Sequence, residues 1–158
     1  MGSRSNIENA YIAGFLDGGD SIMLQIKKRP DLKSGYRFMT TICFYQDTRH
    51  DNYLFWIKKK LNIGYISKRN DEITELRVNG FSSVLKILSD LLPHVRFKKI
   101  QAIKMIEACK ILNSSFRTIS KNNLLNLVEI MIAIQNENYK SGTGKNKEDI
   151  LKMFDLTP

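Results

Sequence analysis

The sequence predicts an α+β fold in which helices cover one face of an antiparallel sheet built from two strand pairs. Residues 21–29 and 36–45 each alternate apolar and polar side chains, as half-buried strands do, and a turn-forming stretch at 30–35 separates them. A second pair spans 64–69 and 73–79, with a turn at Asn70-Asp71. Helical patterns stand before, between and after the pairs. The predicted order is therefore αββαββα with extra C-terminal helices.

The first helix is expected over residues 7–18, with Asn6 as its N-cap and Glu8 in the first turn, where an acid suits the helix dipole. In the first strand, Ile22, Leu24 and Ile26 face the core. In the second strand the core face carries Phe38, Thr40, Ile42 and Phe44.

Apolar residues at helical spacing predict further helices over 48–61, 81–92, 98–112 and 121–136. The helix over 81–92 should end near Pro93, because proline disrupts a helix interior. Residues 141–144 form a loop, and a short helix follows it. The helices can cover only one face of the sheet, so the other face must meet something else.

A chain of 158 residues suits one domain with its own core. We divide it into a tag or disordered N-terminus (1–6), the main domain (7–138), and a C-terminal loop with a short helix (139–158). No apolar run reaches the roughly 18 residues that a membrane span needs. Cys43 and Cys109 lack metal-ligand spacing, which favours two buried thiols in a reducing compartment. We therefore expect an intracellular protein without a membrane partner, in the cytoplasm of a prokaryote or in an organelle.

The net charge of +9 and the pI of about 9.6 favour a polyanionic partner. The charge is clustered: residues 21–50 hold six basic and two acidic side chains, and residues 95–121 hold seven and one. Charge alone leaves DNA, RNA and acidic membranes open. An RNA-binding or membrane-surface module would need stacking aromatic residues or a basic amphipathic helix, and neither is clear in this sequence.

Small residues recur along the first helix at Ala10, Gly14 and Gly18, with Ala13 and Asp17 beside them. Such a stripe lets another helix approach closely. Two interpretations stay open: the stripe packs against the same helix of a second copy, or against later helices of its own chain.

The first helix ends in Asp17-Gly18-Gly19-Asp20. Carboxylates beside the free carbonyls of a helix C-terminus can bind a hard cation such as Mg²⁺ or Ca²⁺. The same residues also suit an acidic turn between a helix and a strand, and their spacing alone does not decide between the two.

The run from Ala10 to Ile22, AYIAGFLDGGDSI, closely resembles the LAGLIDADG motif of homing endonucleases, usually AGFLDGDGSI. Phe44-Tyr45-Gln46 at the end of the second strand and the basic segment from Leu92 to Ala102 resemble members that carry one motif. The resemblance covers about residues 7–135, including the element order.

This resemblance implies the homing-endonuclease fold with a saddle-shaped sheet, and a homodimer joined through Ala10, Ala13, Gly14, Asp17 and Gly18. It implies intron homing: Mg²⁺-dependent hydrolysis of both strands of a long pseudo-palindromic DNA site, with Ca²⁺ binding in place of Mg²⁺ without supporting cleavage. Carried over by position, Gln46 orders water and Lys98 polarises the phosphate. A further basic residue falls on His50, where Arg49 could substitute.

The sequence departs from the motif at the acid itself. The family's metal-binding carboxylate falls on Gly19, and Asp20 stands where the family has glycine. We therefore assign the metal to Gly19 and Asp20, and catalysis to Asp20, Gln46 and Lys98. The reversed order could impair cutting, and an inactivation, a tolerated rearrangement and a sequence error all stay open. The alternative function is a catalytically inactive DNA-binding protein or RNA-splicing maturase of the same fold.

The residues expected to face DNA follow from the strand alternation together with the family's geometry. Arg, Gln and Glu side chains can pair with guanine, adenine and cytosine edges in the major groove. The predicted set is Ser21, Met23, Gln25, Lys27, Arg29, Arg37, Met39, Thr41, Cys43, Tyr45, Arg49, Tyr65, Ser67, Arg69, Glu75 and Arg77.

Overall fold

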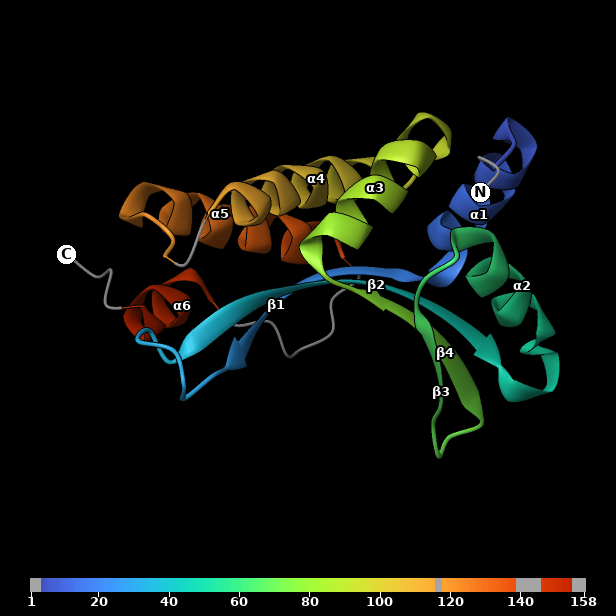
Figure 1. Ribbon diagram of the computed structural model, residues 1–158, viewed down its shortest axis with the longest axis horizontal. Coiled ribbons are helices and arrows are strands. Elements are labelled where there is room, and N and C mark those ends of the chain that lie inside the picture. Colours follow the sequence, from blue (N-terminus) through green and yellow to red (C-terminus); the bar gives the residue numbers. More distant parts are fainter. Residues whose placement is uncertain (1–3, 116–117, 139–145, 155–158) are drawn as a thin grey trace.

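The structure, a computed structural model, describes residues 4–115, 118–138 and 146–154. Figure 1 shows its helices stacked on one side of a curved sheet. The elements follow the order α1 (Asn6–Gly19), β1 (Ser21–Lys28), β2 (Tyr36–Asp47), the 3-10 turn η1 (Thr48–His50), α2 (Asn52–Leu61), β3 (Tyr65–Lys68), β4 (Ile73–Asn79), α3 (Phe81–Leu91), the 3-10 turn η2 (Leu92–His94), α4 (Lys99–Ser114), α5 (Lys121–Glu137) and α6 (Lys147–Met153).

The four strands form one antiparallel sheet in the order β1-β2-β4-β3. The two predicted hairpins are therefore present, and pairing of β2 with β4 joins them. Helices α3, α4 and α5 lie over one face of the sheet, while α1 and α2 stand at one end (Figure 1). The opposite face is concave, and no helix lies across it in the described ranges. The predicted α+β order is confirmed.

The core lies between the sheet and the helices. Ile22, Ile42 and Phe44 are fully buried on the helical face of the sheet. Helix α3 packs on β2, and α4 and α5 pack on β1. The short helix α6 closes the far end, because the ring of Phe154 stacks on that of Phe38 with 5.5 Å between centroids.

The N-terminus differs from its prediction. Ser5, rather than Asn6, caps α1: its hydroxyl accepts the Glu8 N–H, and the Glu8 carboxylate accepts the Ser5 N–H. Arg4 also forms an ion pair with Asp90 on α3, 2.8 Å apart. Residues 4–6 thus belong to the folded domain, which corrects the expected boundary after residue 6. Residues 1–3 lie outside the described residues.

Two element boundaries also differ. Strand β2 continues to Asp47, two residues further than expected, because Gln46 and Asp47 still pair with Thr74 and Ile73 of β4. The helix expected over 48–61 is divided into η1 and α2 at Asp51. The predicted loop at 141–144 lies outside the described residues, whereas the short terminal helix is present as α6. Within the described ranges, none of the helices combines the length and apolar character of a bilayer span.

Candidate nucleic-acid interface

The strand register places the predicted contact residues of all four strands on the concave face, because residues directly opposite in an antiparallel pair share a face. Ser21 lies opposite Cys43, Cys43 opposite Arg77, and Arg77 opposite Tyr65. Further rows join Met23 with Thr41, Gln25 with Met39, Lys27 with Arg37, and Tyr45 with Glu75 and Ser67.

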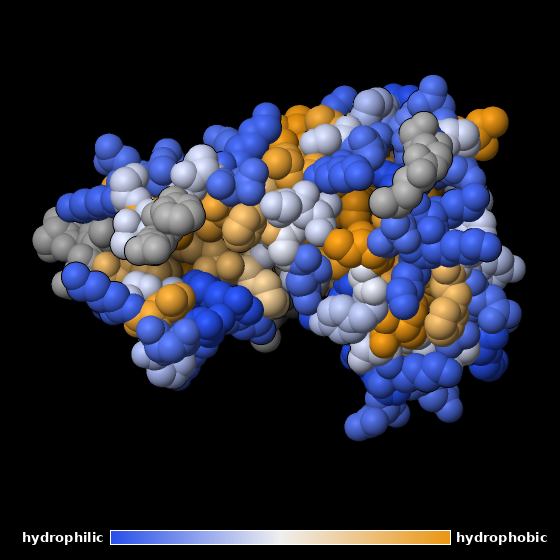
Figure 2. Space-filling model, viewed as in Figure 1, coloured by the Kyte–Doolittle hydropathy of each residue, from blue (hydrophilic) through white to orange (hydrophobic). Residues whose placement is uncertain are grey.

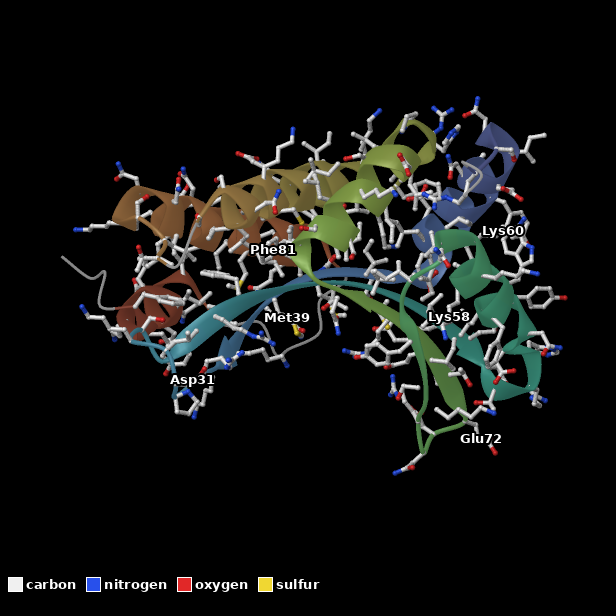
Figure 3. All side chains as sticks on the ribbon, in the orientation of Figure 1. Asp31, Met39, Lys58, Lys60, Glu72 and Phe81 are labelled. Carbon is white, nitrogen blue, oxygen red and sulfur yellow. The ribbon has the colours of Figure 1, made fainter. Side chains whose placement is uncertain are left out.

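This concave face is hollowed between the β1–β2 end and the β3–β4 hairpin (Figure 2). Met39 projects from β2 into the hollow, and Asp31 and Glu72 mark the two hairpin tips on either side of it (Figure 3). Hydrophilic residues predominate on both rims of this hollow, which we call the trough (Figure 2).

Exposure divides the predicted set into three groups. Lys27, Arg37, Arg49, Tyr65 and Arg69 are exposed, whereas Thr41, Cys43 and Glu75 are buried although they point to the concave side. The remaining members are half-buried: Ser21, Met23, Gln25, Arg29, Met39, Tyr45, Ser67 and Arg77.

Asn79 explains the burial of Thr41 and was missed by the sequence analysis. It lies opposite Thr41, accepts the Thr41 hydroxyl at 2.8 Å, and donates to the Tyr65 hydroxyl at 3.2 Å. The alternation of Glu75, Arg77 and Asn79 along β4 carried the signal that could have found it. Thr41 is therefore shielded, and Asn79 offers an amide in the same row.

Four arginines of the predicted interface hold carboxylates of their own chain. Arg29 pairs with Asp31 at 2.7 Å, and Arg49 with Asp47 at 2.9 Å. These guanidinium groups hold the pKa values of Asp31 and Asp47 down at about 2, chiefly through their hydrogen bonds. Arg69 and Arg77 both pair with Glu75, at 3.2 Å and 2.8 Å. Glu75 was expected to read a base edge, but both of its oxygens already accept arginine N–H groups.

The Asp20 carboxylate lies where α1 meets the sheet. Asp20 is 5% exposed, and its Oδ1 accepts the backbone N–H of Tyr45 at 2.8 Å. Its Oδ2 is buried without a hydrogen-bond partner among the described residues. Burial raises the pKa of Asp20 to about 7, against the lowering effects of the Tyr45 N–H and the Lys98 charge.

Lys98 is the other predicted catalytic residue at this end of α1. Its Nζ donates to the Asp17 carbonyl at 3.2 Å, and the Asp17 carboxylate accepts the backbone N–H groups of Arg96 and Lys98 at 2.7 and 3.0 Å. The Lys98 charge also acts on the Asp20 carboxylate, so these two predicted catalytic residues lie near each other. Gln46 stands at the end of β2, where its side-chain carbonyl accepts the N–H of Asp47 at 3.0 Å.

The proposed dimer surface is only partly free. A β-carbon added at Gly14, Gly18 or Gly19 would meet no atom within 4 Å, and Ala10 is exposed beside them. Ala13 is fully buried in the core of its own chain, and Asp17 is held by the segment before α4. The open stripe on α1 therefore consists of Ala10, Gly14 and Gly18, flanked by Ile7 and Tyr11, which are 83% and 56% exposed.

The fit to a divalent cation rests on Asp20 and the nearby carbonyls. The unpartnered Oδ2 offers one hard oxygen ligand, and the carbonyl of Gly19 lies at the same helix end. No group of three His, Cys, Asp or Glu side chains gathers anywhere in the part of the chain that the structure describes. These residues therefore supply only some of the ligands of a metal site, and the remaining ligands have to come from DNA, water or a second copy of the chain.

Comparison with known proteins identifies the family. A family model described as LAGLIDADG endonuclease matches residues 12–112, which include the C-terminal part of α1, the whole sheet and most of α4. The chain belongs to the LAGLIDADG endonuclease family. This confirms the family resemblance seen in the first helix.

The relatives confirm the homing-endonuclease fold. DNA endonuclease I-CvuI of Chlorella vulgaris is 34% identical over 107 residues, covering 68% of this chain and 66% of that protein. Its crystal structure with the I-CreI target and 2 mM Mg, in which the DNA is not cleaved, has a TM-score of 0.85 at 26% identity, covering 94% and 93% of the two chains. A structure of I-CvuI with its own target and 2 mM Ca gives a TM-score of 0.84 at 26% identity, covering 96% and 97%.

Proposed function

We propose that this protein is a site-specific endonuclease that binds a long pseudo-palindromic duplex as a homodimer and hydrolyses both DNA strands, as intron homing requires. The observation that carries the proposal is the concave face of the sheet. Its register gathers the predicted base-contacting side chains of all four strands in one trough, beside a buried acid at the end of α1. I-CvuI, whose fold this chain shares, was crystallised with DNA.

Recognition would follow from the trough. The major groove admits strands, and its base edges present donor and acceptor patterns that Arg, Gln and Asn side chains can read. Gln25 on β1 and Arg77 and Asn79 on β4 offer such groups. Lys27 and Arg37, opposite one another near the hairpin end, supply positive charge for the DNA backbone.

Dimerisation through α1 would complete the site. The open stripe of Ala10, Gly14 and Gly18 lies on the same helix as Asp20, so pairing two stripes brings the two acids towards one axis. One duplex would then lie across two troughs, which explains why a symmetric protein would favour a pseudo-palindromic site.

The hydrolytic step would use groups at this axis. Asp20 and the Gly19 carbonyl would hold Mg²⁺, which polarises the phosphate and lowers the pKa of bound water. Lys98, whose charge acts on Asp20, would stabilise the phosphate from the protein side. Gln46, at the end of β2, would orient water through its amide. We further propose that Ca²⁺ supports binding without cleavage.

The two cysteines bear on the cellular compartment in which the protein acts. The two thiols, Cys43 and Cys109, are free and buried, as suits a reducing compartment. We propose the cytoplasm of a prokaryote or an organelle, where intron DNA is accessible.

The test begins with selection of bound duplexes from a randomised pool in Ca²⁺, followed by incubation of the selected site with Mg²⁺ or EDTA. Double-strand cleavage in Mg²⁺ alone is expected. The variant Gly19→Asp/Asp20→Gly is assayed beside the unaltered chain. Cleavage by that variant alone would identify the chain as a DNA-binding relative that does not cut, and absence of any selected sequence would contradict the proposal altogether.

A further inference from the structure

Glu75 is a buried carboxylate at the centre of a surface that is otherwise suited to DNA. Its side chain is 8% exposed, although it lies on the concave face opposite Tyr45 and Ser67. Its Oε1 accepts Arg69 NH1 at 3.2 Å and its Oε2 accepts Arg77 Nε at 2.8 Å. One acid on β4 therefore holds two arginines, one from its own strand and one from the hairpin tip.

The two arginines keep donors available for another partner. Arg77 is 29% exposed and Arg69 47% exposed, and each guanidinium has five N–H donors in one plane. A carboxylate that accepts hydrogen bonds from one edge of the planar guanidinium group fixes the direction in which the opposite edge points. A fixed fork pairs bidentately with guanine at lower entropic cost than a free one.

Burial explains why the acid itself is unsuited to contact a base. A buried carboxylate is stable only while it is paired, so exchanging an arginine for a cytosine amino group would leave charge uncompensated. The order of charges from the hairpin tip inward is Asp71, Arg69, Glu75, Arg77, which alternates in sign. Each arginine in this series is flanked by an acid, and only Glu75 serves two.

We propose that Glu75 is a positioning residue that sets base specificity: it orients Arg69 and Arg77 towards guanine edges in the major groove and contacts no base itself. This inference rests on the proposed function and names the part of the trough that discriminates between sequences. Asp71, by contrast, is 51% exposed and holds only Arg69, at 2.5 Å. It therefore serves as a matched acid that lacks the bridging role.

The experiment compares Glu75→Gln with Asp71→Asn, two substitutions that each remove one negative charge next to Arg69. Duplexes are selected from a randomised pool in Ca²⁺ with each protein, and affinity for a fixed unrelated duplex is measured by fluorescence anisotropy across a salt series. The glutamine amide can accept one guanidinium but turns an NH₂ group towards the other. Glu75→Gln should therefore lose about 5- to 150-fold in preference for guanine at one or two positions per half-site, the discrimination of one bidentate contact.

Affinity for the unrelated duplex should rise in both variants, because each gains one net positive charge. A purely structural role would instead weaken binding to every sequence together with a loss of thermal stability. Asp71→Asn should keep the guanine preference that Arg77 sets, because Asp71 pairs with Arg69 and Arg77 pairs with Glu75. If Glu75→Gln does not fold, Glu75→Asp carries the test: it keeps the charge but is one methylene too short to serve both arginines, so guanine preference should fall without a gain in unspecific affinity.

Three results would overturn the inference. One is an unchanged base profile in both Glu75 variants, which leaves the proposed function intact. Another is a preference lost at a cytosine, which would make Glu75 a direct reader. The third is a wild-type protein that selects no sequence, which contradicts the proposed function as well.

Discussion

The Asp20 carboxylate accepts the backbone N–H of Tyr45 across 2.8 Å, and this bond joins the end of α1 to β2. The Tyr45 side chain lies on the concave face, where its hydroxyl interacts with Ser21 and Cys43. Tyr45 therefore links the acid that we propose binds the metal to the surface that we propose binds DNA.

Asp20→Asn should abolish cleavage while DNA binding remains. Asparagine keeps the oxygen that accepts the Tyr45 N–H, but it removes the charge that a divalent cation needs. We expect cleavage to fall by about 100-fold or more, the order of effect seen when an electrostatic contribution to a transition state is removed. Plasmid cleavage in Mg²⁺ and gel-shift binding in Ca²⁺ measure the two quantities. Glu107→Gln, at an exposed position of α4, should cleave normally, and equal losses in the two variants would count against Asp20.

The stability of the metal-free protein should depend on pH through Asp20. Its pKa is about 7 in the folded chain against 3.8 ordinarily, so the folded state holds the additional proton between these values. The free energy of unfolding should therefore fall as the pH rises through this window, by at most about 1.4 kcal/mol for each pH unit. Urea unfolding in EDTA at about pH 5 and about pH 8 measures it. Asp20→Asn should remove this decline, and an unchanged slope in the variant would assign the dependence to another group.

Gly14→Leu should separate folding from dimerisation. A β-carbon at Gly14 meets no atom within 4 Å beyond its chain neighbours and the backbone of its own helix, and leucine is the better helix former by roughly 0.5–1 kcal/mol. The single chain should therefore fold at least as well as before. Two stripes facing each other could not approach with the larger side chain between them, so the variant should be monomeric by analytical ultracentrifugation and lose site-specific binding. Ser89→Leu, at an exposed position of α3, serves as the control. A dimeric Gly14→Leu protein would place the interface elsewhere.

Arg37→Ala should weaken binding to all duplexes alike. Arg37 is exposed on the concave face opposite Lys27, where a phosphate contact is expected. Loss of one such contact should reduce the slope of log affinity against log salt by about 1 without changing the selected sequence. Binding titrations across a salt series test this, with Lys86→Ala on the exposed side of α3 as the control. A change confined to one sequence would instead make Arg37 a base reader.

Most of the fold could be predicted from the sequence because its strands are half-buried. The alternation of Ile22, Leu24 and Ile26 fixes both the strand and its two faces, and helical spacing does the same for α2 to α5. The boundaries of the elements were harder to predict from the sequence, because they depend on which strands pair. Strand β2 continues to Asp47 because β4 pairs with it there. The cap fell on Ser5 because Ser5, and not Asn6, stands three residues before Glu8.

The sequence predicted which face of the sheet each site residue occupies, but it did not predict which side chains contact one another. Alternation assigned Thr41 and Glu75 correctly to the concave side, yet it could not show that Asn79 covers one and that two arginines occupy the other. Ala13 belongs to the small-residue stripe in sequence, but the twist of the helix turns it into the core. Burial of this kind is set by side chains from several elements, which no local pattern contains.

Hydroxyl-radical oxidation of the protein with and without its selected duplex tests most directly that the concave face binds DNA. Met39 projects into the trough (Figure 3), and methionine oxidises readily when it is accessible. Bound DNA should slow the oxidation of Met39 and Met23 and leave Tyr53, exposed on the outside of α2, unchanged. Equal oxidation of Met39 in both samples, with protection of Tyr53 instead, would contradict the account.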